Sequence, residues 1–518
     1  MKRKALVGAG LCAALITAGA YMAVTRKDAT SSEPLKVLVL PELKVSDIDP
    51  ARIVFNQTWG YLENLTQPLV EWSPDGQLRA GVAKSWEWVG DELHMHIQDN
   101  YRTVDGLRIT ADDAAFSLKR VIVMARNTHG FIADFLCGDH AITNVDDNCP
   151  GIVADGNTLK LRPIKGKAFL LKMLTAMDFA ILLRSQVDPK TLEIQSFRNS
   201  TGPYHLDLDA SGQMHLSANT SHWRYSDKMP QKITYIPADR NRRPKDPTLR
   251  LPFEMYLDGE IDVLQNFTTD RAELYPVTAK RDGKSILTPT VEIGRLMAVF
   301  TPRGMRELLP ERRIAVGKAL RRVIADVQQQ QFDGSKPTEE FFATFGDGGL
   351  QPDELSQLRQ KFASVAEDKD GEGISVALST SMLKIEHALQ FQMPKAHVDR
   401  SAEDYANGKT GVAEPHIVIA HTDSGWTEDL GLLAYSINMQ DFFPGATEEG
   451  KKWLLHYAEV EDKEQRMKLL RELHYRALAE PWLIPIAAEP YYTLTRSPWT
   501  YQGPKLFNSG ALWHLRRP

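Results

Sequence analysis

EPHIVIAHTDSGWTED, residues 414–429, is the stretch that decides the fold class. Its apolar run Ile417–Ala420 is continuous and rich in β-branched residues, which is typical of a strand buried on both faces of a sheet. The run passes directly into small and polar residues at 421–425. In α/β proteins, ligands bind at the carboxyl ends of the strands. The stretch therefore predicts an α/β protein in which this strand end forms one wall of a ligand cleft.

The length and composition indicate a multidomain globular protein. The chain has 518 residues, too many for one hydrophobic core, so we expect two or three domains. Its 42% hydrophobic and 25% charged residues are ordinary for a globular protein. The formal net charge is -5 at pH 7 and the basic residues are scattered, so the composition does not favour nucleic acid as a partner.

The N-terminus has the features of an export signal. Positive residues at 2–4 precede an uncharged run at 5–24, and Ala18-Gly19-Ala20 fits a cleavage site. Two alternatives stay open. The run is long enough to span a bilayer as an uncleaved anchor, and Cys12 would suit a lipoprotein, although the residues before it fit that signal poorly. Each alternative sends the chain across the membrane.

Two cysteines follow the leader, Cys137 and Cys149, in a segment rich in Gly, Asp and Asn. In an exported chain such a pair predicts a local disulfide. Closing so short a loop would contribute roughly 3 kcal/mol to stability in the chain-entropy model. The alternative is two buried free thiols. A metal site is disfavoured because no CxxC motif and no second Cys/His pair stands beside them.

Local patterns predict several elements with defined ends. Segments 85–89 and 92–97 flank Gly90-Asp91, which indicates a hairpin with a tight turn. Thr110 is placed to cap a helix over 111–125, whose first turn is acidic. Further helices are expected at 311–330 and 462–479.

Catalytic sequence patterns are absent. The chain has no G-x-S-x-G elbow, P-loop, G-x-G-x-x-G or H-E-x-x-H motif. Its scattered Asp, His and Ser residues are not paired at a spacing that indicates a base or a nucleophile. We therefore expect a binding protein and not an enzyme, with no catalytic residue, no cofactor and no metal site.

Two longer runs carry a family resemblance. Residues 65–87 read LTQPLVEWSPDGQLRAGVAKSWE, and residues 103–120 read TVDGLRITADDAAFSLKR. The first resembles the N-terminal signature of the extracytoplasmic solute-binding proteins of family 5, and the second resembles the family segment that follows it. These proteins are the oligopeptide-, dipeptide- and nickel-binding components of ABC importers. Shorter matches follow in the family's order: TGPY at 201–204, HWRY at 222–225, DGEID at 258–262, RRIAVGKAL at 312–320 and WLIPI at 482–486.

The resemblance implies an α/β, two-lobed fold of the type II periplasmic-binding-protein kind that closes on its ligand about a hinge. An extra subdomain sits on the first lobe. A signal peptide or signal-anchor at 1–24 and a linker at 25–34 come first. The expected division beyond them is lobe I at 35–55, 166–268 and 485–518, the inserted subdomain at 56–165, and lobe II at 269–484.

The same resemblance places a ligand contact in the opening stretch. In peptide-binding relatives an Asp in a W-x-A-D-Y segment pairs with the free α-amine of the peptide, and Ile419–Asp423 is similar to that segment. Asp423 then takes the amine-binding position, where a charge-assisted hydrogen bond is roughly twice as strong as a neutral one. The chain departs from the family at the Trp, which is replaced near Ala420, and at the Tyr, which is Ser424. The alternative is that Asp423 caps the following helix.

Other candidate ligand contacts surround this position or follow from the family pattern. Trp426 is a candidate aromatic wall of the cleft. Thr301 stands where the family often has an Asn close to the ligand backbone, and its hydroxyl can still form a hydrogen bond. Trp59 and Tyr61 lie on the helix that enters the subdomain, and the alternative for both is a place in the core. The full set of predicted ligand-binding residues is Asp423, Thr422, Trp426, His421, Thr301, Trp59 and Tyr61.

The chain is therefore predicted to be the substrate-binding component of a peptide-importing ABC transporter. It would capture an oligopeptide or dipeptide between its lobes, through strand-like hydrogen bonds and roomy side-chain pockets, and deliver it to a permease in the inner membrane. We expect a monomer in the periplasm, anchored to the inner membrane if residues 5–24 are not cleaved. Alternatives are a binding protein for a metal chelate, to which His421 would contribute, for haem or for an oligosaccharide, and a membrane-tethered ligand sensor.

Overall fold

The computed structural model describes most of the chain. The described residues are 33–39, 44–53, 56–124, 132–237, 250–265, 274–331, 334–342, 346–379, 382–406, 409–422, 429–431, 448–506 and 509–518. Four predicted features lie wholly or mostly outside these ranges: the N-terminal segment 1–24, the linker 25–34 up to residue 32, Asp423 and Trp426.

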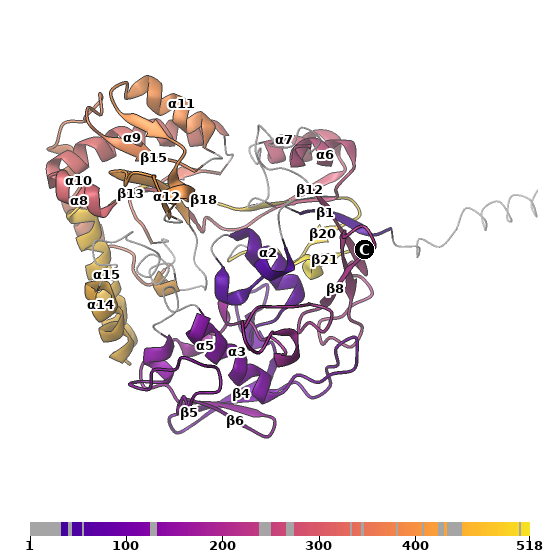
Figure 1. Cartoon of the computed structure of the whole chain (residues 1–518). Helices are drawn as coiled ribbons and strands as arrows, with labels where there is room; N and C mark the ends of the chain where they lie inside the picture. Colours follow the sequence, from indigo (N-terminus) through magenta and orange to yellow (C-terminus); the bar gives the residue numbers. More distant parts are fainter. Residues whose placement is uncertain are drawn as a thin grey trace, which may run out of the picture.

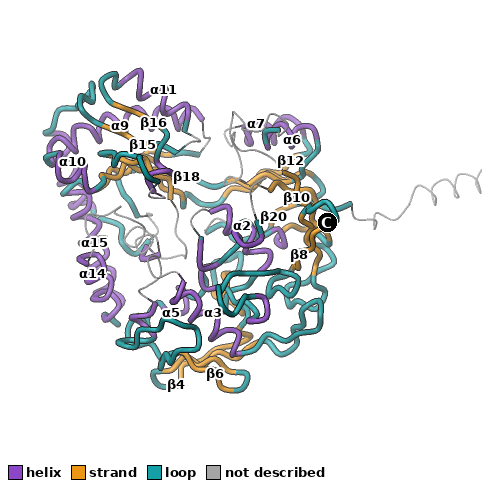
Figure 2. Tube along the Cα trace, viewed as in Figure 1, coloured by secondary structure: helices purple, strands orange, loops and turns teal. Residues whose placement is uncertain are grey.

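Two large sheets organise the part of the chain that the structure describes (Figures 1 and 2). The first has seven strands in the order β12-β19-β11-β1-β10-β9-β8, and β1 pairs in parallel with both β10 and β11. Its strands in chain order are β1 (Leu35–Val39), β8 (Tyr204–Leu208), β9 (Met214–Ala218), β10 (Lys232–Pro237), β11 (Val263–Gln265), β12 (Ser285–Pro289) and β19 (Tyr492–Arg496).

The second large sheet has six strands in the order β14-β18-β13-β17-β15-β16. Its central strand β17 runs antiparallel to β13 and parallel to β15. The six strands are β13 (Gly294–Phe300), β14 (Lys336–Pro337), β15 (Ser375–Ala377), β16 (His397–Asp399), β17 (Ile417–Thr422) and β18 (Leu483–Glu489).

Smaller sheets complete the strand structure of the described residues. A four-stranded sheet has the order β4-β5-β7-β6. Its strands are β4 (Ala83–Val89), β5 (Glu92–Ile97), β6 (Ile152–Asp155) and β7 (Thr158–Leu161). Two-stranded sheets pair β2 (Val70–Trp72) with β3 (Leu78–Ala80), and β20 (Thr500–Tyr501) with β21 (Leu515–Arg516).

The α-helices lie mainly around the two large sheets (Figure 2). Helices α9 and α11 pack against the six-stranded sheet. Leu320 and Val323 of α9 and Leu389 of α11 belong to the same hydrophobic core as the buried residues of β13. The described helices are α2 (Asn56–Leu65), α3 (Ala111–Met124), α5 (Leu170–Met173), α6 (Pro252–Asp258), α7 (Tyr275–Asp282), α8 (Pro302–Glu307), α9 (Pro310–Gln331), α10 (Pro352–Ala363), α11 (Leu383–Gln392), α12 (Ala402–Ala406), α14 (Glu448–Glu459) and α15 (Lys463–Ala479).

Local hydrogen bonds explain why the predicted elements begin and end where they do. Gly90 adopts a positive φ of 62° in the turn between β4 and β5, a conformation that glycine takes without a steric penalty. At the start of α3, Asp113 N–H donates to Thr110 Oγ1 at 3.2 Å and Thr110 N–H donates to Asp113 Oδ2 at 2.9 Å. This reciprocal pair is a capping box, in which Asp takes the place of the usual Glu. The predicted hairpin and helix are confirmed.

The predicted disulfide is also present. Cys137 and Cys149 are bonded, with their Cα atoms 4.7 Å apart, and each residue is 1% exposed. The bond closes the loop between α3 and β6 onto the four-stranded sheet, because both cysteines belong to the same core cluster as Leu159 of β7.

Within the described residues, the chain passes between the two large sheets at residues 290–293 and again at 490–491. The two crossings are tied together, since Thr290 N–H donates to Tyr491 O at 2.9 Å and Tyr491 N–H donates to Thr290 Oγ1 at 2.8 Å. The division into lobes at 268 and 485 stays a prediction. The chain passes from one large sheet to the other somewhat after these predicted boundaries. Strand β12, which follows residue 268, still belongs to the seven-stranded sheet, and β18, which includes residue 485, still belongs to the six-stranded sheet.

A second contact joins the region of the four-stranded sheet to α14, at the left of Figure 1. Gly166 N–H donates to Ala458 O at 2.8 Å, and Lys165 Nζ lies 2.6 Å from Glu459 Oε1. The rings of Phe169 and Tyr457 are buried side by side, with centroids 5.8 Å apart. In this conformation the region of the four-stranded sheet therefore contacts α14, in addition to the connection that the two crossings make between the large sheets.

Candidate ligand-binding site

Strand β17 runs from a buried start to an exposed end, as its sequence predicts. Ile417, Val418 and Ile419 are buried, whereas Ala420, His421 and Thr422 reach the surface. The start of the strand lies in the core of the six-stranded sheet and is held on both sides by β13 and β15. The buried strand is confirmed, its polar carboxyl end is partly exposed, and the role of that end in ligand binding stays a prediction.

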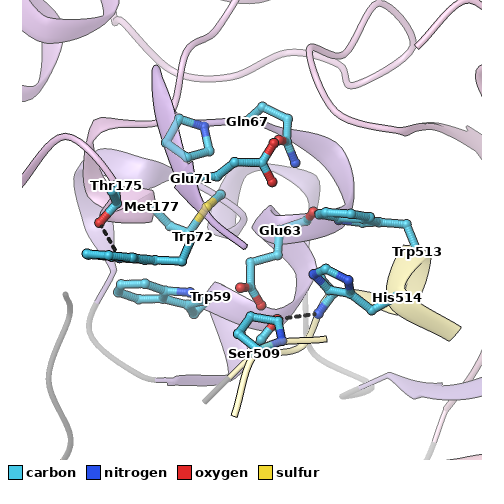
Figure 3. A pocket seen from close by; sticks show the side chains of 13 residues that line it. Trp59, Glu63, Gln67, Glu71, Trp72, Thr175, Met177, Ser509, Trp513 and His514 are labelled. Atoms are coloured by element: carbon cyan, nitrogen blue, oxygen red, sulfur yellow. Dashed lines mark hydrogen bonds between the residues drawn. The ribbon is translucent and has the colours of Figure 1, made fainter. Parts of the chain in front are cut away.

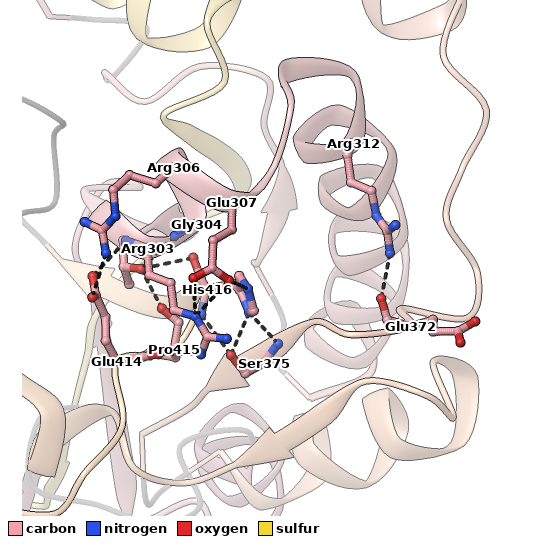
Figure 4. A network of polar contacts seen from close by, with 11 residues as sticks. Arg303, Gly304, Arg306, Glu307, Arg312, Glu372, Ser375, Glu414, Pro415 and His416 are labelled. Atoms are coloured by element: carbon pink, nitrogen blue, oxygen red, sulfur yellow. Dashed lines mark hydrogen bonds and ion pairs between the residues drawn. The ribbon is translucent and has the colours of Figure 1, made fainter.

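A polar network holds the start of β17 in place (Figure 4). The side chain of His416 is buried, its Nδ1 accepts a hydrogen bond from Ser375 N–H at 3.1 Å, and its Nε2 lies 3.0 Å from Glu307 Oε2. Hydrogen bonds from His416 and Arg303 lower the pKa of the Glu307 carboxyl. Arg303 N–H also donates to Glu414 Oε1 at 2.8 Å. The network joins α8, β15 and β17, so the direction of the strand is set by packed elements.

Thr301 serves as a helix cap in this network. It precedes α8, and its Oγ1 accepts a hydrogen bond from Gly304 N–H at 3.2 Å while its hydroxyl donates to Pro415 O. The residue before it, Phe300, pairs with Ile417 at the start of β17. The structure therefore does not bring Thr301 together with the far end of that strand, and its role in ligand binding stays a prediction.

At the far end of β17, the side chain of His421 meets a buried acid. His421 Nε2 lies 3.3 Å from Glu489 Oε2, and the Glu489 side chain is 5% exposed. Ser335 Oγ donates to the other carboxyl oxygen of Glu489 at 3.0 Å. The ring of Tyr491 lies 5.6 Å from that of His421. Because Tyr491 belongs to the second crossing, the end of β17 lies beside the connection between the sheets.

Trp59 and Tyr61 have different places although both lie on α2. Tyr61 is 6% exposed and packs edge-on against Tyr235 of β10, with ring centroids 5.4 Å apart. It is a core residue of the seven-stranded sheet. Trp59 instead lines a pocket between α2 and the C-terminal segment, which we call the α2 pocket (Figure 3). Its described lining residues are Trp59, Glu63, Gln67, Pro68, Glu71, Trp72, Thr175, Met177, Pro504, Ser509, Ala511, Trp513 and His514.

The C-terminal wall of the α2 pocket is fixed by hydrogen bonds to α2. Asn64 Oδ1 accepts from Leu512 N–H at 2.8 Å, and Asn64 Nδ2 donates to Gly510 O at 3.2 Å. Trp513 Nε1 donates to the backbone oxygen of Glu63 at 3.1 Å, and Gly510 N–H donates to the Glu63 carboxyl. The wall is also attached to the first crossing, because Val291 N–H donates to Lys505 O at 2.9 Å.

Glu63 is a buried acid in this pocket. Burial raises the pKa of the Glu63 carboxyl to about 8, and hydrogen bonds from Gly510 and its neighbours only partly oppose the rise. Sequence analysis missed Glu63, and also Glu489 and Arg295, which are both buried near the crossings. The sequence feature that could have indicated them is a charged residue inside an otherwise apolar segment. Only the structure shows which of these side chains are enclosed.

Metal-binding clusters and membrane-spanning helices are both absent from the described part of the chain. Among the described residues, no group of three or more His, Cys, Asp or Glu side chains is arranged to hold a metal ion. Helices long and apolar enough to cross a membrane are likewise not found in the described part of the chain.

The arrangement of sheets and crossings is that of a two-lobed periplasmic binding protein. The structure of the murein tripeptide binding protein MppA of Escherichia coli matches 94% of this chain and 99% of its own, with a TM-score of 0.68 and 17% identity. A dipeptide binding protein from Pseudoalteromonas matches with a TM-score of 0.71 and 12% identity, over 94% and 100% of the two chains. These likenesses confirm the predicted two-lobed α/β fold.

Relatives found by sequence carry related names. The chain is 22% identical over 231 residues to MppA of E. coli, covering 43% of this chain and 42% of MppA. It is 24% identical over 283 residues to the periplasmic oligopeptide-binding protein OppA of Salmonella typhimurium, covering 51% and 49%. The chain thus matches less than half the length of each of these curated relatives, and no family model matches it. The relatives and the shared fold support the family 5 resemblance seen in the motifs.

Proposed function

We propose that the chain is the substrate-binding component of an ABC importer of peptides and acts in the periplasm. The observation that carries this proposal is the pair of hydrogen-bonded crossings between two sheets, with the polar end of β17 beside them. Such a hinge lets two lobes close on a ligand, and a membrane permease can then distinguish the closed form from the open one. The names of the relatives, which refer to peptides and to the periplasm, support the ligand class and the compartment.

The proposed division of labour follows the domains expected from the sequence. Lobes I and II enclose the peptide, and the inserted subdomain extends lobe I. Asp423, the next residue in the sequence after β17, is the proposed contact for the α-amine of the peptide, and His421, Thr422 and Trp426 are further proposed ligand contacts. A partly desolvated carboxylate in that place forms a charge-assisted hydrogen bond with the ammonium group. The chain acts as a monomer, catalyses no reaction and needs no cofactor.

Mass spectrometry of the ligand that stays bound through native purification tests the function. A mixture of short peptides is the expected result. A lone metal chelate, haem or an oligosaccharide would overturn the peptide assignment and leave the fold intact. The same preparation, analysed by N-terminal sequencing, shows whether residues 1–20 have been removed or whether an anchor remains.

The amine contact has its own test. Asp423→Asn should weaken binding of a free tripeptide by about 2–5 kcal/mol, the usual cost of removing one partner of a buried ion pair. The N-acetylated tripeptide, which has no ammonium group, should lose little further affinity in the variant. Asp227→Asn, at an exposed acid between β9 and β10, is the matched control. Equal affinity of wild type and Asp423→Asn would leave Asp423 as a helix cap only.

A further inference from the structure

A row of residues crosses four neighbouring strands of the six-stranded sheet, at the end next to the crossings. The strands lie in the order β14-β18-β13-β17. Ser335 comes just before β14, Glu489 ends β18, Gly294 begins β13 and His421 lies near the end of β17. Although β13 separates their strands, His421 Nε2 and Glu489 Oε2 are 3.3 Å apart. The row therefore joins the polar end of β17 to the connection between the sheets.

The absence of a side chain at Gly294 leaves room for this contact across β13. A Cβ atom at this position would lie 3.0 Å from His421 Nε2 and 3.3 Å from a ring carbon of Tyr491, which is closer than ordinary van der Waals contact. A larger residue would therefore crowd the imidazole against Glu489. Gly294 directly follows the first crossing and Glu489 directly precedes the second, so the contact lies at the hinge.

His421 is the cationic partner that the fold provides for Glu489. The Glu489 side chain is 5% exposed, and among the described residues the His421 ring is the basic group that lies within ion-pair distance of it. Ser335 Oγ donates to its other carboxyl oxygen at 3.0 Å. Burial disfavours an isolated carboxylate, so a positive charge on His421 stabilises the ionised form of Glu489.

The other charged groups near this pair are engaged elsewhere. Arg295, on the neighbouring strand β13, donates to the backbone oxygens of residues 292, 294 and 341. Its strongest charge interactions are with Asp429, Glu292 and Glu340, in that order. Lys336, next to Ser335 in the chain, forms an ion pair with Glu292. None of these groups takes the place of His421 beside Glu489.

The His421 ring has a second nitrogen that does not face the acid. The side chain is 29% exposed, against 5% for Glu489, and within the described residues Nδ1 forms no hydrogen bond. The ring of Tyr491 packs beside the imidazole, with an angle of 30° between the ring planes. A carboxylate facing Nε2 favours a proton on that nitrogen. Nδ1 is then the atom that gains the second proton, and it is the atom that a ligand can reach.

We propose that Glu489 positions His421 so that the protonated ring donates from Nδ1 to the terminal carboxylate of a bound peptide. This inference rests on the proposed peptide-binding function and names the ligand group that His421 takes. The imidazolium lies between two carboxylates, one from the protein and one from the ligand, and both favour the charged ring. His421 contacts the ligand, whereas Glu489 acts through His421 and is a positioning residue.

The arrangement makes peptide binding depend on pH. Histidine side chains change their charge between pH 5 and pH 8. Lowering the pH from 8 to 6 adds the Nδ1 proton from solvent, so the affinity for a peptide with a free carboxylate should rise severalfold. A peptide amide offers no carboxylate, and its affinity should change little over the same range.

The test compares dialanine and trialanine with their C-terminal amides by titration calorimetry of the full chain at pH 6 and pH 8. At pH 6 a free acid should bind at least tenfold more tightly than its amide. His421→Gln should abolish this preference. Glu489→Gln, which keeps an acceptor for Ser335 Oγ, should reduce it at least fivefold and flatten the pH dependence. Glu472→Gln, at an exposed acid on α15, is the matched control and should change neither.

Imidazole NMR signals of the nitrogen-15-labelled protein report on the contact itself. The His421 signals, identified by their loss in His421→Gln, should shift when the free acid is added but not when its amide is added. A shift of equal size with both ligands would contradict a contact to the carboxylate. The same signals should also change in Glu489→Gln, since that variant removes the charge facing Nε2.

The outcomes separate this inference from the proposed function. Equal affinities of acid and amide at pH 6, in both pairs, would overturn the carboxylate contact and leave peptide binding standing. A pH dependence that is unchanged in Glu489→Gln would overturn the role of Glu489. Failure of all four ligands to bind would overturn the peptide function and, with it, this role of His421.

Discussion

Replacing Glu63 by glutamine should change how the stability of the protein depends on pH. Glutamine keeps an oxygen that accepts the hydrogen bond from Gly510 N–H, but it cannot ionise. In the folded wild type, burial raises the pKa of Glu63 from its ordinary 4.5 to about 8. Between these two values the unfolded chain has lost the Glu63 proton while the folded protein retains it. The folded state binds more protons, so the free energy of unfolding of the wild type falls as the pH rises.

The size of the effect follows from the same shift. One pKa unit corresponds to about 1.4 kcal/mol, so Glu63 should remove roughly 3 kcal/mol of wild-type stability between pH 5 and pH 8. The glutamine variant lacks this loss. Its free energy of unfolding, relative to the wild type, should therefore increase by roughly 3 kcal/mol over that range, with little change below pH 4.5.

Urea denaturation at pH 5, 6, 7 and 8, followed by tryptophan fluorescence, measures the difference. Glu254→Gln provides the control, because this acid is exposed on α6 and the exchange of carboxyl for amide is the same. If the stability of Glu63→Gln and that of the wild type follow parallel curves over the whole pH range, Glu63 is not a protonated buried acid and the reasoning fails.

Three further predictions concern the disulfide, the polar network and the contact at α14. The double variant Cys137→Ser/Cys149→Ser should lose about 3 kcal/mol of unfolding free energy, and a reductant should then have no further effect; equal stability with the wild type would contradict this. His416→Phe should cost about 1–3 kcal/mol in urea denaturation, because it removes the buried imidazole that accepts from the half-buried N–H of Ser375. A loss no larger than that of the exposed control His397→Phe would refute the network. Tyr457→Ala removes the packing of α14 against Phe169, so it should enlarge the radius of gyration measured by X-ray scattering and weaken peptide binding. Lys452→Ala, at an exposed position on the same helix, should change neither quantity.

Features that depend on short-range interactions were predictable from the sequence. The turn at Gly90 requires a positive φ that glycine supplies, and the start of α3 follows from two side chains three residues apart. The apolar run at 417–419 predicted a buried strand because β-branched side chains pack on both faces of a sheet. The disulfide joins residues 12 apart in one loop. In each of these cases the signal lies within a short stretch of the chain, even where, as for the strand, the partners that cover it are distant in sequence.

The candidate site could be predicted only in part. The end of β17 was found because the change from apolar to polar residues is visible in the sequence. Thr301 is predicted as a ligand contact from a family position, and that role stays a prediction; the structure shows that its hydroxyl caps α8 at the opposite end of the strand pair. Tyr61 and Trp59 are two residues apart on α2, and yet one packs in the core and the other lines a pocket. Which face of a helix is buried depends on what packs against it.

By itself, the amino-acid sequence determined the α/β class, the local elements and the order of family motifs, because periodicity and turn chemistry act over a few residues. The tertiary structure alone decided which strands share a sheet, where the two crossings are bonded, and that Glu63 meets Gly510, 447 positions later in the chain. An acid on a helix ionises normally in water. Enclosure by a segment from the far end of the chain raises the pKa of that same acid to about 8, and no local pattern records that enclosure.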